Sequence, residues 1–481
     1  MEQIDIATIK KRSVAGVLAL TSRTFLLQMI SLFSFTLLSA FLSESAIGVY
    51  VVVAAIMRLV SFFSDFGLGA AIVQKKEQIT DEDLQTAFTI QFIITGLIFL
   101  VFLVFYKSVA VFFNLSADGG LLLLALIFTL FLSSFKTIPS VLLERELKFG
   151  KLIIPQIAEN IVFNGILVYL AFTGFGVASY TYSTLAASII GIPIYYLISP
   201  WNLRIGIKKS SLKILLYGTT FQAKSILGTI KDDLMTTFLA KLLTFSQIGL
   251  IGWGQKWAFF PFRFIVDSVT KVTFSAYSRL QHDKKELRYF IEKSIFTTSV
   301  IMFPVSAGLI ITSAKFISFI PSYDKWNGAL ISLTFFSLNA AVSSISNILV
   351  NVLDSTGHVK TTFKLMMIWT VMTWTLTPVL IYTIGYNGVS IASFMITLTV
   401  FYTIYLVKKI VNFSLLENIL PQIFASGVMS VLVSLINYYF VSNIVLLFAN
   451  IFFGITIYTV VLYLTSKNKL KEFIMLIISQ K

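Results

Sequence analysis

The feature that most constrains this chain is a series of fourteen apolar stretches, each long enough to cross a lipid bilayer as a helix. A helix needs about 20 predominantly apolar residues to span the hydrocarbon core. None of the stretches alternates between apolar and polar residues as the strands of a membrane barrel do. The sequence therefore predicts an all-α integral membrane protein with about fourteen transmembrane helices, near 16–38, 46–64, 84–106, 119–137, 152–172, 177–199, 214–242, 247–270, 290–313, 327–350, 362–384, 386–407, 418–439 and 442–465.

Composition excludes the other broad classes of protein. Hydrophobic residues make up 57% of the 481 residues and charged residues only 12%, whereas a soluble domain is typically ~25% charged. The apolar content is also far too high for a disordered chain. There is no cysteine and there are only two histidines, so we expect no disulfide, no metal site and no cofactor. A G-x-x-x-x-G-K-[ST] phosphate loop is missing as well, which argues against ATP hydrolysis by that route.

The basic residues predict how the chain is oriented in the membrane. The net charge of +15 would suggest nucleic-acid binding in a soluble protein, but in a membrane protein it indicates cytoplasmic loops. With the N-terminus inside, the internal loops carry 27 of the 37 Lys and Arg residues, Lys136 among them, and the external loops carry three. We therefore expect both termini in the cytoplasm. The external loops are too short for a catalytic domain, so we expect no enzyme.

A short sequence motif occurs twice and predicts an internal repeat. Ser45–Val49 reads S-A-I-G-V and Ser246–Leu250 reads S-Q-I-G-L, at an offset of 201 residues that also aligns Arg23 with Lys224. Six spans per repeat give two lobes of parallel topology, related by an axis along the membrane normal. The predicted organisation is an N-lobe (1–200), a basic cytoplasmic linker (201–213), a C-lobe (214–410), and two further spans with a cytoplasmic tail (411–481).

Seven basic residues fall inside the predicted spans, against four acidic ones: Arg23, Arg58, Lys224, Lys231, Lys241, Lys256 and Arg263, with Glu159, Asp232, Asp233 and Asp267. A charge at the bilayer centre costs at least ~2.5–3.5 kcal/mol. Snorkelling to an interface is the simpler interpretation for Lys241 and is open for Arg58. It is less plausible for Arg23, Lys224, Lys256 and Arg263. These four predict a basic cavity for an anionic group such as a lipid-linked pyrophosphate, because Arg binds phosphate bidentately and Lys as a point charge. Structural ion pairs between helices are the alternative.

Two of the acidic residues are candidates for coupling transport to an ion. Glu159 stands as an isolated carboxylate in the fifth span, where it is either a proton or sodium site or the counter-ion of an arginine. Asp267 follows Arg263 by four residues, a spacing that allows the two side chains to pair on one helix face.

The acidic run Asp81–Asp83 spells a D-x-D string, which occurs in proteins that bind sugar nucleotides. It follows Thr80 directly and opens the third span. Threonine is a preferred N-cap residue, and acidic side chains stabilise the first turn of a helix. We therefore interpret the run as a helix cap rather than a binding motif.

Five sequence strings follow one another along the chain: Ser64–Gln74 with its D-F-G-L-G core, the set Pro139, Leu143, Arg145, Leu147 and Phe149, then Phe274–Gln281, Tyr323–Trp326, and Gly357. Taken in order, they resemble the Wzx-type polysaccharide flippases of the multidrug/oligosaccharidyl-lipid/polysaccharide (MOP) exporter superfamily. The resemblance covers nearly the whole chain and departs from the family pattern at Ser275, where proline is usual, and at the external turn, where a glycine is missing.

This resemblance implies two six-helix lobes around a central cavity in a bacterial plasma membrane. It implies export of an undecaprenyl-pyrophosphate-linked oligosaccharide by alternating access, with a polysaccharide polymerase and a chain-length regulator as possible partners. It further implies cavity arginines in spans one, two and eight, which here are Arg23, Arg58 and Arg263. A cation-coupled drug or metabolite antiporter of the same superfamily, and a membrane polysaccharide polymerase or ligase, remain alternatives.

Overall fold

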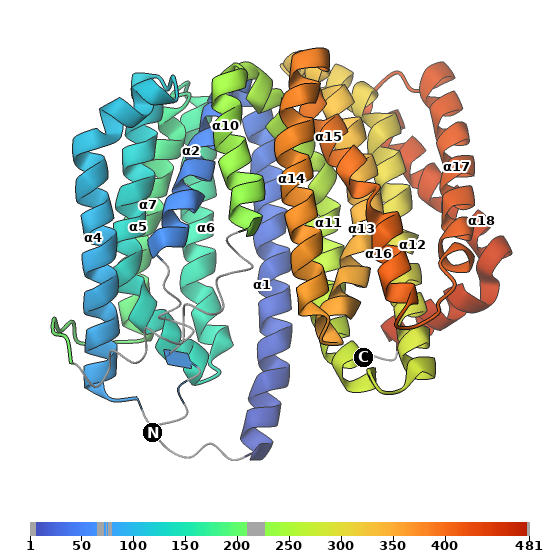
Figure 1. The fold of residues 1–481 in the computed structure, drawn as a ribbon. Coiled ribbons are helices and arrows are strands. Elements are labelled where there is room, and N and C mark those ends of the chain that lie inside the picture. The colour runs from blue at the N-terminus through green and yellow to red at the C-terminus, as the bar shows by residue number, and fades with distance from the viewer. Residues whose placement is uncertain (1–5, 65–71, 74, 76–78, 209–226, 479–481) are drawn as a thin grey trace. The chain divides into compact units, whose positions relative to one another are not determined.

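A computed structural model describes residues 1–481 except 1–5, 65–71, 74, 76–78, 209–226 and 479–481. The chain divides into two compact units, Met1–Gly249 and Leu250–Lys481. All long regular elements of the described residues are helices (Figure 1). The first unit contains α1 (Ile6–Phe41), α2 (Glu44–Ser64), α4 (Asp81–Phe112), α5 (Ala117–Arg145), α6 (Phe149–Phe172), α7 (Ala178–Ile198), a π-helix η2 (Ile230–Leu234) and α10 (Met235–Leu242).

Helix α11 (Phe245–Leu280) begins in the first unit and continues into the second. The division thus falls later in the chain than the linker predicted at 201–213. The second unit then contains α12 (Lys284–Phe319), a 3-10 helix η3 (Asp324–Ala329), α13 (Leu330–Ser355), α14 (Val359–Ile384), α15 (Gly388–Thr397), α16 (Val400–Lys408), α17 (Leu416–Tyr439) and α18 (Ile444–Ile478).

Twelve helical segments of the described residues are long and apolar enough to span a membrane. They coincide with twelve of the fourteen predicted spans, so the all-helical membrane class is confirmed and the count of fourteen is not. Part of the seventh predicted span, 214–242, lies outside the described residues. The eighth, 247–270, lies within α11, which forms as one 36-residue helix but carries Lys256 and Arg263 in its middle and is not among the twelve.

Within the first unit, α4, α5, α7, α6 and α1 pack in succession, and α2 packs on α5 (Figure 1). The core between α4 and α5 is apolar, with Leu84, Phe88, Ile138 and Val141 buried in one cluster. Both η2 and α10 pack on α2. This contact explains why the chain after residue 226 groups with the first unit.

The two copies of the repeated motif meet in the first unit. A Cβ at Gly48 would lie 1.8 Å from the carbonyl oxygen of Phe245, and a Cβ at Gly249 would lie 1.9 Å from the carbonyl oxygen of Glu44. Both pairs of equivalent positions keep the offset of 201 residues. Such reciprocity is what a local twofold axis between the first turns of α2 and α11 produces. Glycine is required at both positions because only a helix without a side chain there lets the backbones approach this closely.

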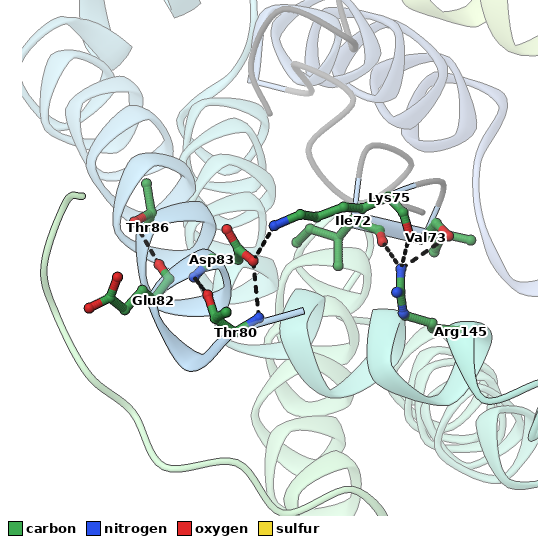
Figure 2. Close-up of polar contacts among 8 residues, drawn as sticks. All are labelled: Ile72, Val73, Lys75, Thr80, Glu82, Asp83, Thr86 and Arg145. Atoms are coloured by element: carbon green, nitrogen blue, oxygen red, sulfur yellow. Dashed lines mark hydrogen bonds and ion pairs between the residues drawn. The ribbon is translucent and has the colours of Figure 1, made fainter. Parts of the chain in front are cut away.

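The N-terminus of α4 is capped as the sequence predicts. The Thr80 hydroxyl accepts from the Asp83 backbone N–H at 3.3 Å, and Asp83 Oδ2 accepts from the Thr80 N–H at 3.0 Å, which completes a capping box (Figure 2). The same carboxylate forms a 2.6 Å ion pair with Lys75, and Asp83 is buried. The acidic run is thus a structural element of the bundle.

Arg145, at the end of α5, holds the chain that leads from α2 to α4. Its Nη1 donates to the carbonyl oxygens of Ile72 at 2.8 Å and of Lys75 at 2.7 Å (Figure 2). Most of the preceding string, 65–71 and 74, lies outside the described residues. The contacts give the arginine of the family-like loop a structural role, since they join the end of α5 to the chain before α4.

The second unit is built around α12 and α13. One apolar cluster lies between α12, α13, α14 and α16, and another joins α12 to α17 and α18. Trp253 of α11 stacks on Trp326 of η3 with ring centroids 5.4 Å apart, and both side chains are buried. This stack is therefore part of the core and offers no free face to a sugar.

Candidate functional site

The charged side chains inside the helices form separate groups, and the first unit holds two of them. The first group joins α2 to η2. Arg58 Nε donates to Asp233 Oδ1 at 2.6 Å, with 54% of the Arg58 side chain exposed and 18% of the Asp233 side chain. Next to it, Lys231 pairs with Asp232 at 2.5 Å. The four charges sum to zero, so this group is electrically balanced as it stands.

The π-helix explains how two neighbouring aspartates reach different partners. In a π-helix the backbone bonds skip one residue further than in an α-helix, and such turns mark functional sites often. The carbonyl oxygens of Asp232 and Asp233 accept hydrogen bonds from the hydroxyls of Thr236 at 2.7 Å and Thr237 at 2.8 Å. The sequence D-D-x-x-T-T therefore satisfies the carbonyls of the π-turn locally.

The second group lies between α5, α6 and α7. Lys136 Nζ forms a 2.8 Å ion pair with Glu159 Oε1, with side-chain exposures of 15% and 22%. The carboxylate rests directly on α7, because a Cβ at Gly191 would lie 1.6 Å from Glu159 Oε1. Glu159, predicted as an isolated carboxylate, is thus a paired one. Its partner is a lysine, whereas the sequence had suggested an arginine.

Arg23 of α1 belongs to the same region. Its charge acts on Glu144 of α5 and on the Tyr195 hydroxyl of α7, which also senses Glu159. The Arg23 Nε is buried, and no atom among the described residues accepts a hydrogen bond from it. The structure therefore brings together one predicted substrate residue, Arg23, and one predicted coupling residue, Glu159.

In the second unit, Lys256 and Arg263 lie seven residues apart on α11, and the charge of Arg263 acts on Lys256. Lys256 is half-buried, and Arg263 is exposed. No described residue accepts a hydrogen bond from the Arg263 guanidinium. Lys224 lies outside the described residues, and so does the side chain of Asp267, so the predicted pairing of Arg263 with Asp267 stays a prediction.

Sequence reasoning misplaced Lys136 and missed its group. Lys136 was counted with an internal loop, next to the predicted end of the fourth span at 137. In the structure α5 continues to Arg145, with Ile138 and Val141 buried beyond Lys136. The apolar residues that follow Lys136 on the same helix could have indicated that the helix continues past this single charge. The misplacement matters for function, because Lys136 neutralises Glu159 inside the bundle.

Lys241 of α10 contacts the end of α4. Its ammonium lies 3.8 Å from the centroid of the Phe112 ring and donates to the Phe112 carbonyl oxygen at the C-terminal end of α4. A cation at a helix C-terminus is stabilised by the helix dipole. Lys241 is therefore a structural cap and leaves the set of basic residues available to a ligand.

What remains available is a set of arginines. Among the described residues Arg58 is bonded through Nε alone, Arg23 lacks an acceptor at Nε, and Arg263 lacks any. A guanidinium carries five donors in a planar fork that matches carboxylate and phosphate oxygens. Each of these guanidinium groups, taken within its own unit, is therefore suited to bind an oxyanion by charge and hydrogen bonds.

Comparison with known proteins assigns the chain to a family. The profile of the family described as "Polysaccharide biosynthesis protein" matches residues 37–331. The lipopolysaccharide biosynthesis protein WzxC of Escherichia coli strain K12 is 26% identical over 380 residues, which cover 74% of this chain and 73% of WzxC.

Two solved structures share the fold. The lipid II flippase MurJ, in an inward closed conformation, matches with a TM-score of 0.72 and 18% identity over 93% of this chain and 99% of MurJ. A MOP superfamily transporter from Pyrococcus furiosus matches with a TM-score of 0.52 and 13% identity over 82% of this chain and 96% of that protein. The helical architecture is therefore that of this group of membrane proteins.

Proposed function

The chain belongs to the polysaccharide biosynthesis protein family of the MOP superfamily, and on this premise we propose that it is a flippase for a lipid-linked oligosaccharide. The substrate is an oligosaccharide on undecaprenyl pyrophosphate, carried from the cytoplasmic to the outer face of a bacterial plasma membrane for surface polysaccharide assembly. Support comes from the relative WzxC, named for lipopolysaccharide biosynthesis, and from the fold shared with MurJ.

The observation that carries the proposal is the presence of arginines with open donors inside helices. Arg23, Arg58 and Arg263 each keep guanidinium donors that no described residue accepts from. Within apolar helices such donors are costly unless a ligand or water satisfies them. A pyrophosphate supplies the charge and the acceptors, and Lys224 and Lys256 would add point charges to the same ligand.

The membrane topology completes the proposal. We infer that 214–242 and the 247–270 part of α11 add two spans to the twelve, giving fourteen with both termini in the cytoplasm. A helix of 36 residues is about 54 Å long, more than enough to span. Spans one to six then move against spans seven to twelve to expose the head group on alternate sides, while the lipid tail stays in the bilayer.

Glu159 is our candidate for ion coupling, with Asp267 as a second. Lys136 forms an ion pair with Glu159, so a cation that binds the Glu159 carboxylate would compete with the lysine ammonium. Binding of such an ion would add one positive charge to the first unit. The first unit would then attract an anion more strongly.

The location of the lipid-linked units in a deletion strain tests the function. We expect such a strain to lose surface polymer and to keep lipid-linked units inside the cell. Units displayed outside but left unpolymerised would indicate a polymerase instead. Normal polymer with altered drug sensitivity would indicate an antiporter. Restoration of polymer by wild type and by Arg288→Ala, an exposed arginine of α12, but not by Arg263→Ala, would tie the function to the α11 arginine.

A further inference from the structure

The contact between Arg58 and Asp233 has an asymmetry that points to a role. Asp233 accepts from Nε at 2.6 Å, and within the described part of the chain it is the hydrogen-bond partner of the Arg58 side chain. No described residue accepts a hydrogen bond from the two terminal Nη groups. A guanidinium held at Nε presents its Nη pair as a fork, which is the arrangement that binds two oxygens of a phosphate.

The surroundings keep this geometry fixed. Asp233 is four-fifths buried, with 18% of its side chain exposed, whereas 54% of the Arg58 side chain is exposed. The backbone of Asp233 is anchored in the π-turn, where Thr237 donates to its carbonyl oxygen at 2.8 Å. The acidic partner is therefore the fixed member of the pair, and the arginine is the accessible one.

We propose that Asp233 is a positioning residue that holds Arg58 at Nε so that its two Nη groups bind a phosphate oxyanion of the transported lipid. This inference rests on the proposed function, because Arg58 is placed among the substrate residues there. A free arginine side chain loses rotamer entropy when it is ordered. Asp233 removes part of that loss before the ligand arrives, and the π-helix serves to aim the carboxylate at Nε.

Two other roles for Asp233 predict different behaviour. If Asp233 were a competing anion that the phosphate must displace, both Asp233→Ala and Asp233→Asn would bind anions more tightly than wild type. If the pair served stability only, neither substitution would change anion affinity. The positioning role predicts that Asp233→Ala weakens anion binding and that Asp233→Asn does not, because Asn keeps the acceptor oxygen that orients Arg58 and Ala does not.

The neighbouring residue Asp232 offers a matched control. Asp232 lies in the same π-turn and carries the same charge, but it pairs with Lys231 and its side chain is 68% exposed. Asp232→Ala therefore makes the same change in net charge and in chemistry without touching Arg58. Arg58→Gln supplies the background in which any effect of Asp233 on Arg58 must vanish.

The experiment titrates purified full-length protein in nanodiscs of zwitterionic lipid, by calorimetry, with two probes. Inorganic pyrophosphate reports the free anion, and undecaprenyl pyrophosphate incorporated in the nanodisc reports the lipid head group. We expect Asp233→Ala to weaken binding about fivefold, Asp233→Asn to bind within twofold of wild type or more tightly, and Asp232→Ala to stay within twofold. In the Arg58→Gln background Asp233→Ala should have no further effect.

The outcomes distinguish a failure of the positioning role from a failure of the proposed function. An Asp233→Ala variant that binds as tightly as wild type, or as Asp232→Ala, overturns the positioning role while the proposed function stands. An effect that persists in the Arg58→Gln background overturns it as well. Wild type that binds neither probe contradicts the anion site of the proposed function itself. The apparent unfolding midpoint of each variant shows that a loss of binding is not a loss of fold.

Discussion

Alanine at either glycine of the α2–α11 crossing gives a prediction whose size follows from the structure. The added Cβ would lie 1.8 Å from the Phe245 oxygen for Gly48→Ala and 1.9 Å from the Glu44 oxygen for Gly249→Ala, while real Cβ atoms essentially never come within 3.0 Å of another heavy atom. The helices must therefore separate by more than about 1 Å. Overpacking costs about 1–3 kcal/mol, and we expect the upper end because both opposing atoms are backbone atoms that no rotamer change can move.

The twofold relation between the two sites makes the prediction sharper. Once one alanine has parted the helices, the second enters the same gap, so the double variant should lose about 3 kcal/mol rather than twice that. Gly427→Ala is the control, since no atom lies within 4 Å of its Cβ and alanine favours a helix by about 1 kcal/mol. The measurement is the denaturant midpoint of purified protein in one detergent. Equal behaviour of Gly48→Ala and Gly427→Ala, or strictly additive losses in the double variant, would refute the reasoning.

Three further changes probe the first unit. Gly191→Ala should break the Lys136–Glu159 pair, because its Cβ would lie 1.6 Å from Glu159 Oε1. The unfolding midpoint of Gly191→Ala should therefore be lower than that of wild type, whereas the midpoint of the Gly427→Ala control should not fall. Lys136→Met alone should destabilise by roughly 3–5 kcal/mol, while Lys136→Met with Glu159→Met should lose much less, and a double variant as unstable as the single one would contradict the pairing. Arg145→Ala should cost about 2–4 kcal/mol because two carbonyls lose a charged donor. Arg145→Lys should recover part of that loss. Limited proteolysis near residue 75 is the measurement, and Arg145→Lys should be cleaved more slowly there than Arg145→Ala.

The parts of the fold that were predictable are those set by local sequence. Twelve spans follow from apolar runs of sufficient length, since the bilayer requires about 20 such residues whatever their neighbours are. The capping box at Thr80 follows from spacing within four residues. The repeated S-x-I-G motif contains Gly48 and Gly249, and the structure shows a close backbone approach at both positions. The two-lobe repeat that the motif predicts stays a prediction.

The parts that were not predictable depend on contacts between distant residues. Lys136 and Glu159 are 23 residues apart, and Arg58 and Asp233 are 175 apart, so neither pair leaves a periodic signal. The charges of α11 keep it out of the twelve apolar segments, although the predicted span 247–270 lies within it. The predicted fourth span ended at 137 because Lys136 and Pro139 suggested the end of the helix. The helix continues to Arg145, since a proline inside a membrane helix is tolerated when neighbouring groups satisfy the backbone.

Translocation in proteoliposomes tests the central claim most directly. An undecaprenyl-pyrophosphate-linked oligosaccharide would be loaded on one leaflet, and the accessibility of its sugar to a glycosidase added on the other side would be followed in time. We predict transfer by wild type and by Arg288→Ala, and a rate at least tenfold lower for Arg263→Ala. Transfer by Arg263→Ala at the wild-type rate would contradict the arginine site, and no transfer by intact wild type would contradict the flippase itself.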